Sequence, residues 1–200
     1  QETRYVLFAE QMFGESSSKT ANVLLRYQPD RAACVVDSRY AGKVVRDVNP
    51  VIDSDVPIVG SVKASLEYNP TDVVIGVAPT GGQLPEEWRT EMAAAISSGL
   101  NIISGLHTYL SEDQEFIESA GKHDVALIDL RKPPEIISIA EGAWRDRTVP
   151  VIQTIAPDCA FGKLTAAWEL KRQLENRDFA VGFVATGQTG ILLSGRGIVR

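Results

Sequence analysis

The chain has 200 residues, of which 44% are hydrophobic and 23% charged, so it is long enough for one large globular domain or for one domain and part of another. A net charge of −6 and a pI near 5.0 argue against nucleic acid or an anionic membrane as the main partner, because both attract clustered lysine and arginine. Two cysteines make no disulfide framework, and no apolar run reaches the roughly 20 residues of a membrane span, so we expect a cytoplasmic protein.

Short apolar segments rich in β-branched residues alternate with amphipathic helical segments in the first part of the chain. Near-continuous hydrophobicity is typical of parallel strands that are covered on both faces. The alternation predicts a doubly wound α/β sheet, and we assign a Rossmann-like domain to residues 1–140. The predicted strands are Tyr5–Ala9, Ala32–Val36, Val73–Val77, Asn101–Ser104 and Val125–Leu130, and the predicted helices are Ser18–Tyr27, Pro85–Ser98 and Ser111–Lys122.

Helix termini carry their own signals. Ser111 is the expected N-cap of the third helix, because a hydroxyl there can accept from the first free amides. Gly99 and Gly121 stand where C-terminal caps are expected.

The pattern changes after Arg131. Pro133–Pro134 can continue neither a helix nor a central strand, and the polar residues 141–149 are predicted to be a linker. Residues 150–200 then begin a second α/β unit of the P-loop NTPase kind. A whole α/β domain usually needs about twice this length, so we expect a fragment, or a domain completed by another chain in a homo-oligomer. Its predicted elements are a buried strand at Val149–Ile155, a helix from Gly162 to about Glu175 and a strand at Phe179–Ala185.

The loop between that strand and helix has the anatomy of a phosphate-binding P-loop. Free backbone amides at a helix start attract anions, and Gly162 lets the backbone curl without a Cβ clash. Lys163 can reach a β- or γ-phosphate, and the Thr165 hydroxyl can bind Mg²⁺. The predicted phosphate-binding residues are Asp158, Cys159, Ala160, Phe161, Gly162, Lys163, Leu164 and Thr165.

This loop departs from the common pattern G-x-x-x-x-G-K-[ST]. Pro157 or Ala156 takes the place of the first glycine, and Leu164 stands where serine or threonine should follow the lysine. A longer variant with Asp158 inside it resembles the loop of dethiobiotin synthetase-type enzymes. A plain strand–turn–helix with a lysine facing solvent is the alternative. Pro157 also removes one amide donor from the loop.

A second polar loop, Ala185–Gly190, follows the last predicted strand. It should lie beside the P-loop at the carboxyl ends of the strands, where open α/β sheets bind ligands. The residues that could bind a phosphate or a substrate amide are Thr186, Gly187, Gln188 and Thr189, and a glycine-rich turn is the alternative.

Two features of the N-terminal domain only partly match nucleotide sites. The segment Gly14–Thr20 lacks a glycine before Lys19 and lacks G-x-G-x-x-G, so we interpret it as a helix start with serine N-caps. Asp37 ends the second strand, where dinucleotide-binding domains place a ribose-binding acid. Without the glycine fingerprint, a capping or turn aspartate is favoured.

Other polar groups stand at the ends of predicted strands and could line one crevice. They are Gly81–Gly82, His107, Asp129 and Arg131. His107 is the best general-base candidate because the unperturbed pKa of histidine is about 6.5, and a structural role is equally open. Asp129 and Arg131 could pair with each other. Alternatively, Arg131 or Arg39 could hold a substrate carboxylate bidentately.

Together these motifs resemble a bacterial family of unknown function that has an N-terminal Rossmann-like domain and a C-terminal P-loop domain. One branch of that family is described as D-glutamate N-acetyltransferase-like. The resemblance implies a small-molecule substrate with a carboxylate and further residues after Arg200. The segments that carry it are Val36–Lys43, Ile75–Gly82, Ser104–His107, Asp129–Pro134, Asp158–Lys163 and Ala185–Ile191.

Three functions remain open. The first is acyl transfer from acetyl-CoA to an acidic amino acid, with His107 as base and the backbone of Gly187–Gly190 as oxyanion donors. The second is ATP-dependent ligation or phosphorylation with Mg²⁺. The third is non-catalytic nucleotide sensing, which the altered Ala156–Pro157 start favours.

Overall fold

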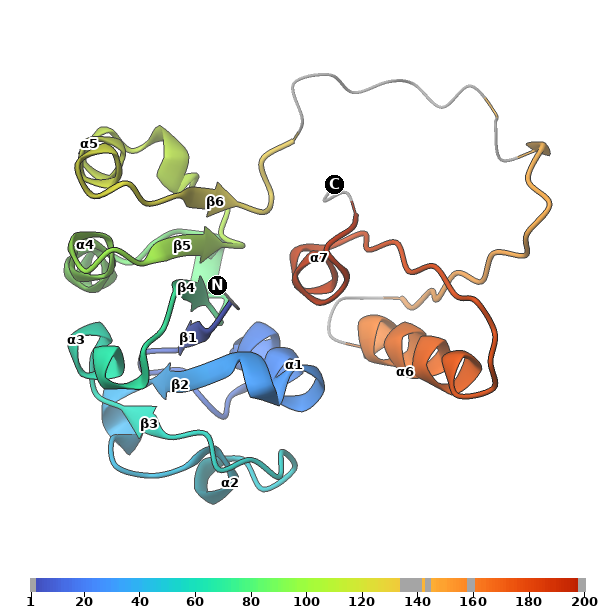
Figure 1. The fold of residues 1–200 in the computed structure, drawn as a ribbon, viewed down its shortest axis with the longest axis horizontal. Coiled ribbons are helices and arrows are strands. Elements are labelled where there is room, and N and C mark those ends of the chain that lie inside the picture. Colours follow the sequence, from blue (N-terminus) through green and yellow to red (C-terminus); the bar gives the residue numbers. More distant parts are fainter. Residues whose placement is uncertain (1–2, 134–141, 143–144, 158–160, 198–200) are drawn as a thin grey trace. The chain divides into compact units, whose positions relative to one another are not determined.

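Figure 1 shows the computed structural model of the chain, which describes residues 3–133, 142, 145–157 and 161–197. The chain divides into two compact units, residues 1–132 and 133–200, which we call the N-terminal unit and the C-terminal unit. Residues 134–141 and 143–144 lie outside the described residues, so the linker at 141–149 stays a prediction.

The N-terminal unit is built on a six-stranded, all-parallel sheet with the order β3-β2-β1-β4-β5-β6. This confirms the predicted Rossmann-like sheet, and each predicted strand is present with ends that differ by at most two residues. The sequence did not predict β3, because a strand of two residues is too short to show a hydrophobic periodicity. The strands are β1 Tyr5–Phe8, β2 Ala32–Val36, β3 Ile58–Val59, β4 Asp72–Ile75, β5 Asn101–Ser104 and β6 Leu127–Asp129.

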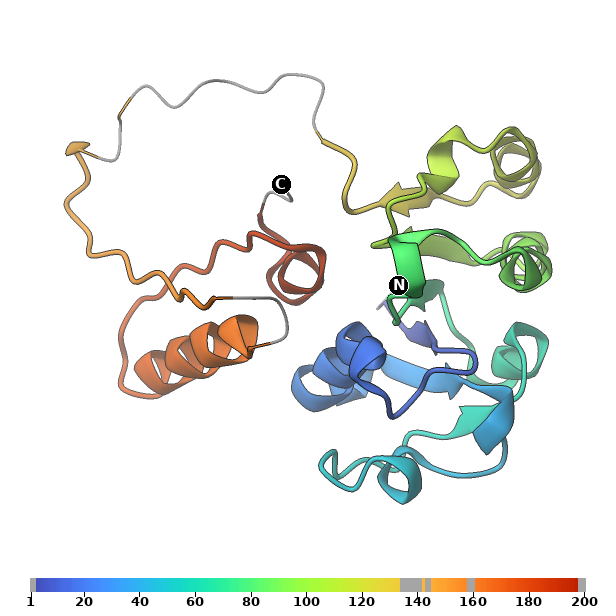
Figure 2. The same ribbon diagram turned by 180° about the vertical axis from the view of Figure 1, so that it is seen from behind.

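Helices cover both faces of this sheet. Figures 1 and 2 show α3, α4 and α5 on one face and α1 on the other. The central strand β1 is fully buried between them, as continuous apolar strands require. Two helices of four residues, α2 and α3, were missed. The bounds are α1 Lys19–Tyr27, α2 Val45–Val48, α3 Val62–Ser65, α4 Arg89–Ser97 and α5 Gln114–His123, with 3₁₀ turns at η1 Ser16–Ser18, η2 Pro29–Arg31, η3 Ser38–Tyr40, η4 Leu66–Tyr68, η5 Thr80–Gly82, η6 Glu86–Trp88 and η7 Leu110–Glu112.

Two of the predicted helix caps are wrong. Asp113, not Ser111, caps α5, and its carboxylate accepts from the amides of Glu115 and Phe116. Gly121 lies inside α5, which ends on Asp124 in the left-handed region at φ 53°. Gly99 does follow α4 with φ +78°, so that prediction is confirmed. A carboxylate that accepts two amides outcompetes the nearby hydroxyl.

The described residues of the C-terminal unit form two helices, α6 Lys163–Glu175 and α7 Gln188–Ser194. The helix prediction is confirmed, but neither predicted strand is part of a ladder among the described residues. One isolated parallel bridge joins Ala185 to Gly197. The side chains expected in a core are open to solvent instead, with 83% of Ile155 and 74% of Val184 exposed. Extended backbone becomes a strand only when a neighbour accepts its hydrogen bonds, and no described strand lies beside these segments.

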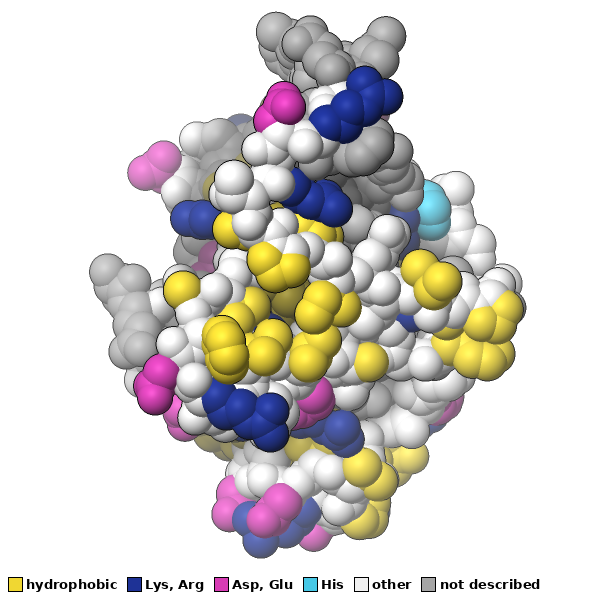
Figure 3. All heavy atoms as spheres, turned by 90° about the vertical axis from the view of Figure 1, so that its right-hand side faces the viewer, with side chains coloured by type: hydrophobic (Ala, Val, Ile, Leu, Met, Phe, Trp, Pro, Cys, Tyr) yellow, Lys and Arg dark blue, Asp and Glu magenta, His cyan; other side chains and the backbone are white. Residues whose placement is uncertain are grey.

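Exposed hydrophobic side chains are therefore a feature of the C-terminal unit, and Figure 3 shows such side chains gathered on one face. The exposed members are Val149, Val151, Ile152, Ile155, Phe161, Leu170, Phe179 and Val184.

The two helices of this unit pack through a glycine. A Cβ atom on Gly190 would lie 2.8 Å from the Ala185 Cβ and 3.2 Å from the Leu164 Cδ1. Leu164 therefore follows Lys163 as a packing residue, which explains why a leucine stands in place of serine or threonine. Among the described residues, no helix is long and apolar enough to cross a lipid bilayer.

Candidate functional site

The start of α6 has the geometry of an anion-binding helix terminus. Gly162 is the N-cap in the left-handed region, with φ 81°, and the first intrahelical bond runs from the Ala166 amide to the Gly162 carbonyl at 2.9 Å. The backbone amides of the residues that precede Ala166 in the first turn have no partner within the helix. Those of Leu164 and Thr165 have no acceptor among the described residues. Dipole and amides together favour an anion at this end.

Lys163 and Thr165 are half-buried at this terminus. The Lys163 carbonyl accepts from the Thr154 hydroxyl at 3.2 Å, which ties the preceding extended segment to the helix start. Phe161 is 67% exposed beside them. Asp158, Cys159 and Ala160 lie outside the described residues, so their part in the loop stays a prediction.

The second predicted loop is the first turn of α7. Gly187 is its N-cap with extended backbone, and the Ile191 amide donates to the Gly187 carbonyl at 3.1 Å. Gln188 and Thr189 are helical, and Thr189 is buried. Because Gly190 touches Leu164, α7 begins close to the start of α6. Thr186 and Gly187 precede the helix.

The side chains of Asp37 and Arg39 form hydrogen bonds and ion pairs with other residues of the N-terminal unit. The buried Asp37 carboxylate accepts from the Phe13 amide at 2.9 Å and from the Arg39 amide, Nε and Nη2. Arg39 also forms an ion pair with Glu15 at 3.0 Å, and its hydrogen bonds to Asp37 raise the pKa of the guanidinium. The interpretation of Asp37 as a turn residue is confirmed, and Arg39 has no nitrogen left for a substrate carboxylate.

The start of α1 is likewise occupied by the protein itself. The Ala21 amide donates to the Gly76 carbonyl at 2.9 Å, and a Cβ on Gly76 would lie 2.8 Å from the Ala21 Cβ. This agrees with a plain helix start. The predicted serine caps are wrong, because the Ser18 hydroxyl donates to the Glu15 carbonyl instead.

At the carboxyl ends of β4, β5 and β6 the structure brings together three of the predicted polar positions. The His107 amide donates to the Gly82 carbonyl at 2.7 Å, and a side chain on Gly82 would overlap the His107 ring. Arg131 Nε donates to the Gly105 carbonyl at 2.7 Å, which orients the guanidinium. Asp129 accepts from the Leu110 and Ser111 amides and does not pair with Arg131.

Arg131 differs in this respect from Arg39 and Arg89. Arg39 and Arg89 are each paired with two or more carboxylates, and these pairs raise both pKa values. Arg131 forms no ion pair with a described carboxylate. Its terminal nitrogens are thus available to a carboxylate ligand.

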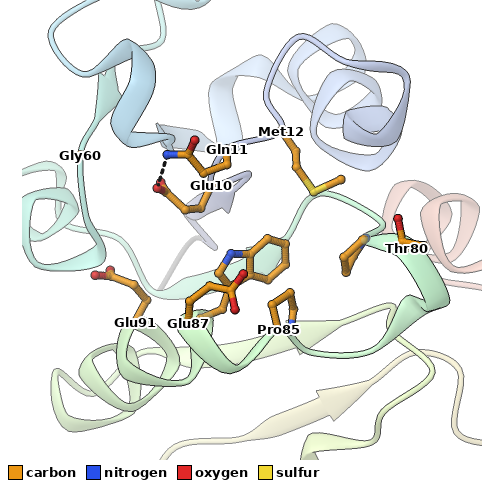
Figure 4. A pocket seen from close by; sticks show the side chains of 10 residues that line it. Glu10, Gln11, Met12, Gly60, Thr80, Pro85, Glu87 and Glu91 are labelled. Atoms are coloured by element: carbon orange, nitrogen blue, oxygen red, sulfur yellow. Dashed lines mark hydrogen bonds between the residues drawn. The ribbon is translucent and has the colours of Figure 1, made fainter.

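A pocket that the sequence did not predict lies where the sheet order reverses, between β1 and β4. It has a volume of about 400 Å³ and is lined by the loops after these two strands (Figure 4). Open α/β sheets bind ligands at this point. The sequence does offer one indication of this pocket, because the polar residue Glu10 directly follows the first predicted strand. Only the strand order shows that this strand end lies where the sheet order reverses.

Comparisons with known proteins identify the family. A family model described as a Rossmann-like domain of unknown function, DUF1611_N, matches residues 38–133. A second, described as a P-loop domain, DUF1611_C, matches residues 138–200. The chain belongs to the DUF1611 family. A crystal structure of a DUF1611 family protein from Anabaena variabilis matches with a TM-score of 0.91 and 33% identity over 99% of this chain.

Two curated relatives carry the name D-glutamate N-acetyltransferase. The one from Pseudoalteromonas sp is 36% identical over 62% of this chain, and the one from Tritonibacter scottomollicae is 33% identical over 63%. Each match spans 37% of the relative's own length. The chain also covers 57% of the solved Anabaena chain.

Proposed function

We propose that this DUF1611 chain is part of an N-acetyltransferase that moves the acetyl group of acetyl-CoA to the amine of an acidic amino acid such as D-glutamate. The observation that carries the proposal is the open, glycine-capped start of α6 with Lys163 as its first residue. Its support outside the chain is the name of the two curated relatives.

The proposed role of the α6 start is to hold the phosphates of acetyl-CoA. The amides of Leu164 and Thr165 would donate to phosphate oxygens, and Lys163 would supply the positive charge. Charge-assisted hydrogen bonds of this kind are roughly twice as strong as neutral ones. The N-terminal residues of the loop, Asp158 to Ala160, are proposed to complete the cradle.

The proposed acceptor site is the carboxyl edge of β5 and β6 in the N-terminal unit. Arg131 would hold a carboxylate of the acceptor, and the exposed His107 ring would take a proton from its ammonium group. The free amine then attacks the thioester carbonyl, a C–N bond forms, the C–S bond breaks and CoA leaves as the thiol. The products are the N-acetyl amino acid and CoA.

Ligand binding tests the first step. The thermal stability of the full-length protein is measured with ATP, GTP, CoA and acetyl-CoA, each with and without Mg²⁺, because a ligand that binds the native state raises Tm. Stabilisation by CoA and acetyl-CoA, lost in Lys163→Ala and kept in Lys171→Ala on the same helix, is expected. An undiminished response in Lys163→Ala would remove the ligand from this site.

Turnover tests the second step. Release of free CoA thiol is followed with D-glutamate, L-glutamate and an uncharged amino acid as acceptors. Arg131→Lys should raise KM for the acidic acceptor with a smaller change in kcat, since lysine cannot bind a carboxylate bidentately. Arg26→Lys, an exposed change on α1, is the control. Equal rates with charged and uncharged acceptors would contradict the assignment of Arg131.

ATP-dependent ligation or phosphorylation is the second proposal, because Thr165 stands in the first turn of α6 where a hydroxyl can reach Mg²⁺. The same panel separates the two, since this chemistry requires a Mg²⁺-dependent response to ATP. Binding of ATP without turnover by the full-length protein would favour a nucleotide-sensing role instead.

A further inference from the structure

The pocket between the ends of β1 and β4 has no part in the proposed acetyl transfer. Its walls come from the loop after β1, the loop after β4, the first turns of η6 and α4, and Gly60 after β3. A volume of about 400 Å³ is in the range of small-molecule sites. Figure 4 shows Glu10 and Gln11 on one side of it and Glu87 and Glu91 on the other.

Three carboxylates, those of Glu10, Glu87 and Glu91, line this pocket, and no lysine, arginine or histidine is among its described lining residues. None of the three forms an ion pair with a described residue. Neighbouring acids do: Glu15 pairs with Arg39 and Glu86 lies 3.9 Å from Arg89. The pocket therefore concentrates negative charge that the described part of the protein leaves uncompensated.

Two of these carboxylates are fixed by neutral donors. Glu10 accepts from the Ser38 amide at 2.8 Å and from Gln11 Nε2 at 3.0 Å. Glu91 accepts from the Val62 amide at 2.7 Å, at the start of α3. Amide donors orient a carboxylate without cancelling its charge. Glu87 is exposed and has no partner among the described residues, so it is available to a ligand.

Trp88 supplies an independent signal at the same pocket. Only 4% of its surface is exposed, and its ring packs edge-on against Phe8 with centroids 5.2 Å apart. Its indole N–H has no acceptor among the described residues. Among the described residues, Ser17 Oγ is the only side-chain polar atom that is both enclosed and without a partner. The Trp88 nitrogen is therefore not fully enclosed, and Trp88 is one of the residues that line the pocket. Buried indole N–H groups usually find an acceptor.

The arrangement is unsuited to a metal ion. Among the described residues, no group of three histidine, cysteine, aspartate or glutamate side chains could hold one. The three carboxylates thus do not converge on a point. A compound with separated positive groups therefore suits these carboxylates better than a single ion does.

We propose that this pocket binds a small organic ammonium compound that also carries a hydroxyl or carbonyl oxygen. The ammonium groups would face Glu10, Glu87 and Glu91, and the oxygen would accept from the Trp88 indole. The same negative charge disfavours D-glutamate and acetyl-CoA, both of which carry net negative charge. The site is therefore separate from the α6 start and does not depend on the proposed acetyl transfer.

Three matched probes test the chemistry by isothermal titration calorimetry on the full chain. They are 1,3-diamino-2-propanol, 1,3-diaminopropane, which lacks the oxygen, and glycerol, which lacks the charges. We expect the amino alcohol to bind tightest, the diamine more weakly, and glycerol not measurably. Salt should weaken the first two because the attraction is electrostatic. Equal binding of glycerol, or no binding of the amino alcohol, would overturn the proposal.

Variants assign the binding to the pocket. Glu87→Gln should weaken amino-alcohol binding by about fivefold, the effect of an exposed ion pair at its upper end. Glu86→Gln, the same change one residue away and outside the pocket, should leave it unchanged, as should Lys163→Ala. Trp88→Phe should remove the preference for the amino alcohol over the diamine. Equal losses in Glu86→Gln and Glu87→Gln would reduce the effect to general surface charge and overturn the assignment.

Discussion

The two units of this chain carry similar apolar strand signals and reach different outcomes. In the N-terminal unit Val6, Leu7 and Phe8 are fully buried because β1 pairs with β2 and β4 and helices cover both faces of the sheet (Figure 1). In the C-terminal unit Val149–Ile155 carries four aliphatic side chains beside Gln153 and Thr154, yet Ile155 is 83% exposed and has no described neighbour strand. Burial of apolar side chains is favourable in both units, but a core forms only where neighbouring strands complete a sheet.

The second contrast concerns polar groups. The N-terminal unit satisfies the buried Asp37 with four donor contacts, whereas at the α6 start of the C-terminal unit the Leu164 and Thr165 amides have no acceptor among the described residues. Satisfied groups stabilise a fold, and open donors are available to ligands.

Removing the Asp37 carboxylate should have the largest effect on stability. In Asp37→Ala the buried Phe13 amide loses its acceptor and Arg39 keeps only Glu15 and the Phe13 carbonyl as partners, so the free energy of unfolding should fall by about 3 kcal/mol. Urea denaturation measures it. Asp30→Ala, at an exposed acid of the same unit, should change little. Similar losses of unfolding free energy in both variants would show that the hydrogen bonds of Asp37 do not stabilise the fold.

A methyl group at Gly190 tests the packing of the C-terminal unit. In Gly190→Ala the new Cβ would press on Ala185 and Leu164, so the unfolding free energy of this unit should fall by about 1–3 kcal/mol. Gly182→Ala is the control, because no atom lies within 4 Å of a Cβ there. Hydrogen exchange of α6 and α7 measures the change. If both variants exchange alike, the close approach of α7 to α6 is not stabilising.

The neighbouring glycines Gly81 and Gly82 test the placement of His107. Both have positive φ, so alanine at either should cost about 1 kcal/mol through backbone strain. Only a side chain on Gly82 overlaps the His107 ring. The imidazole NMR signals of His107 should therefore shift in Gly82→Ala and stay in Gly81→Ala. Acetyl transfer should fall more in the first variant. Unchanged His107 signals in both would contradict the contact.

The smallest effect is expected at the surface. Hydrogen bonds from Arg89 hold the pKa of Asp113 below its usual value. A lowered folded-state pKa stabilises the protein above the unfolded value of about 3.9, and this contribution is lost as pH falls through the folded value. Asp113→Asn should lower the free energy of unfolding by about 0.5–1 kcal/mol at neutral pH. The further loss of stability that the wild-type protein shows below a pH of about 4 should be smaller in this variant. Thermal unfolding between neutral and acid pH checks this, and an identical acid limb would refute it.

Much of the fold was readable from the sequence because it depends on local periodicity. β1, β2, β4, β5 and β6 were expected, as were α1, α4, α5 and α6. The elements missed are β3, α2 and α3, each of two to four residues and too short for a period to appear, and the seven-residue α7, whose first turn was interpreted as a loop. Cap positions failed by a few residues because Asp113 and Ser111 compete for the same helix start.

The sites divide in the same way. The P-loop motif at Gly162–Thr165 and the gathering of His107 and Arg131 were visible as residue patterns at strand and helix ends. The turn role of Asp37 was visible too. The partners of Arg39 and Asp129 were not, because they include residues from another part of the chain. The pocket of Glu10, Glu87 and Glu91 was invisible, because its walls come from segments far apart in sequence.

By itself the sequence determined the all-parallel α/β class, the glycine-capped start of α6 and the excess of negative charge, because apolar period, backbone freedom and ionisation are properties of short segments. Only the tertiary structure decided which arginines are already paired, where the sheet order reverses and which strand signals become strands. These depend on partners that long-range packing brings into contact, and no local pattern specifies them.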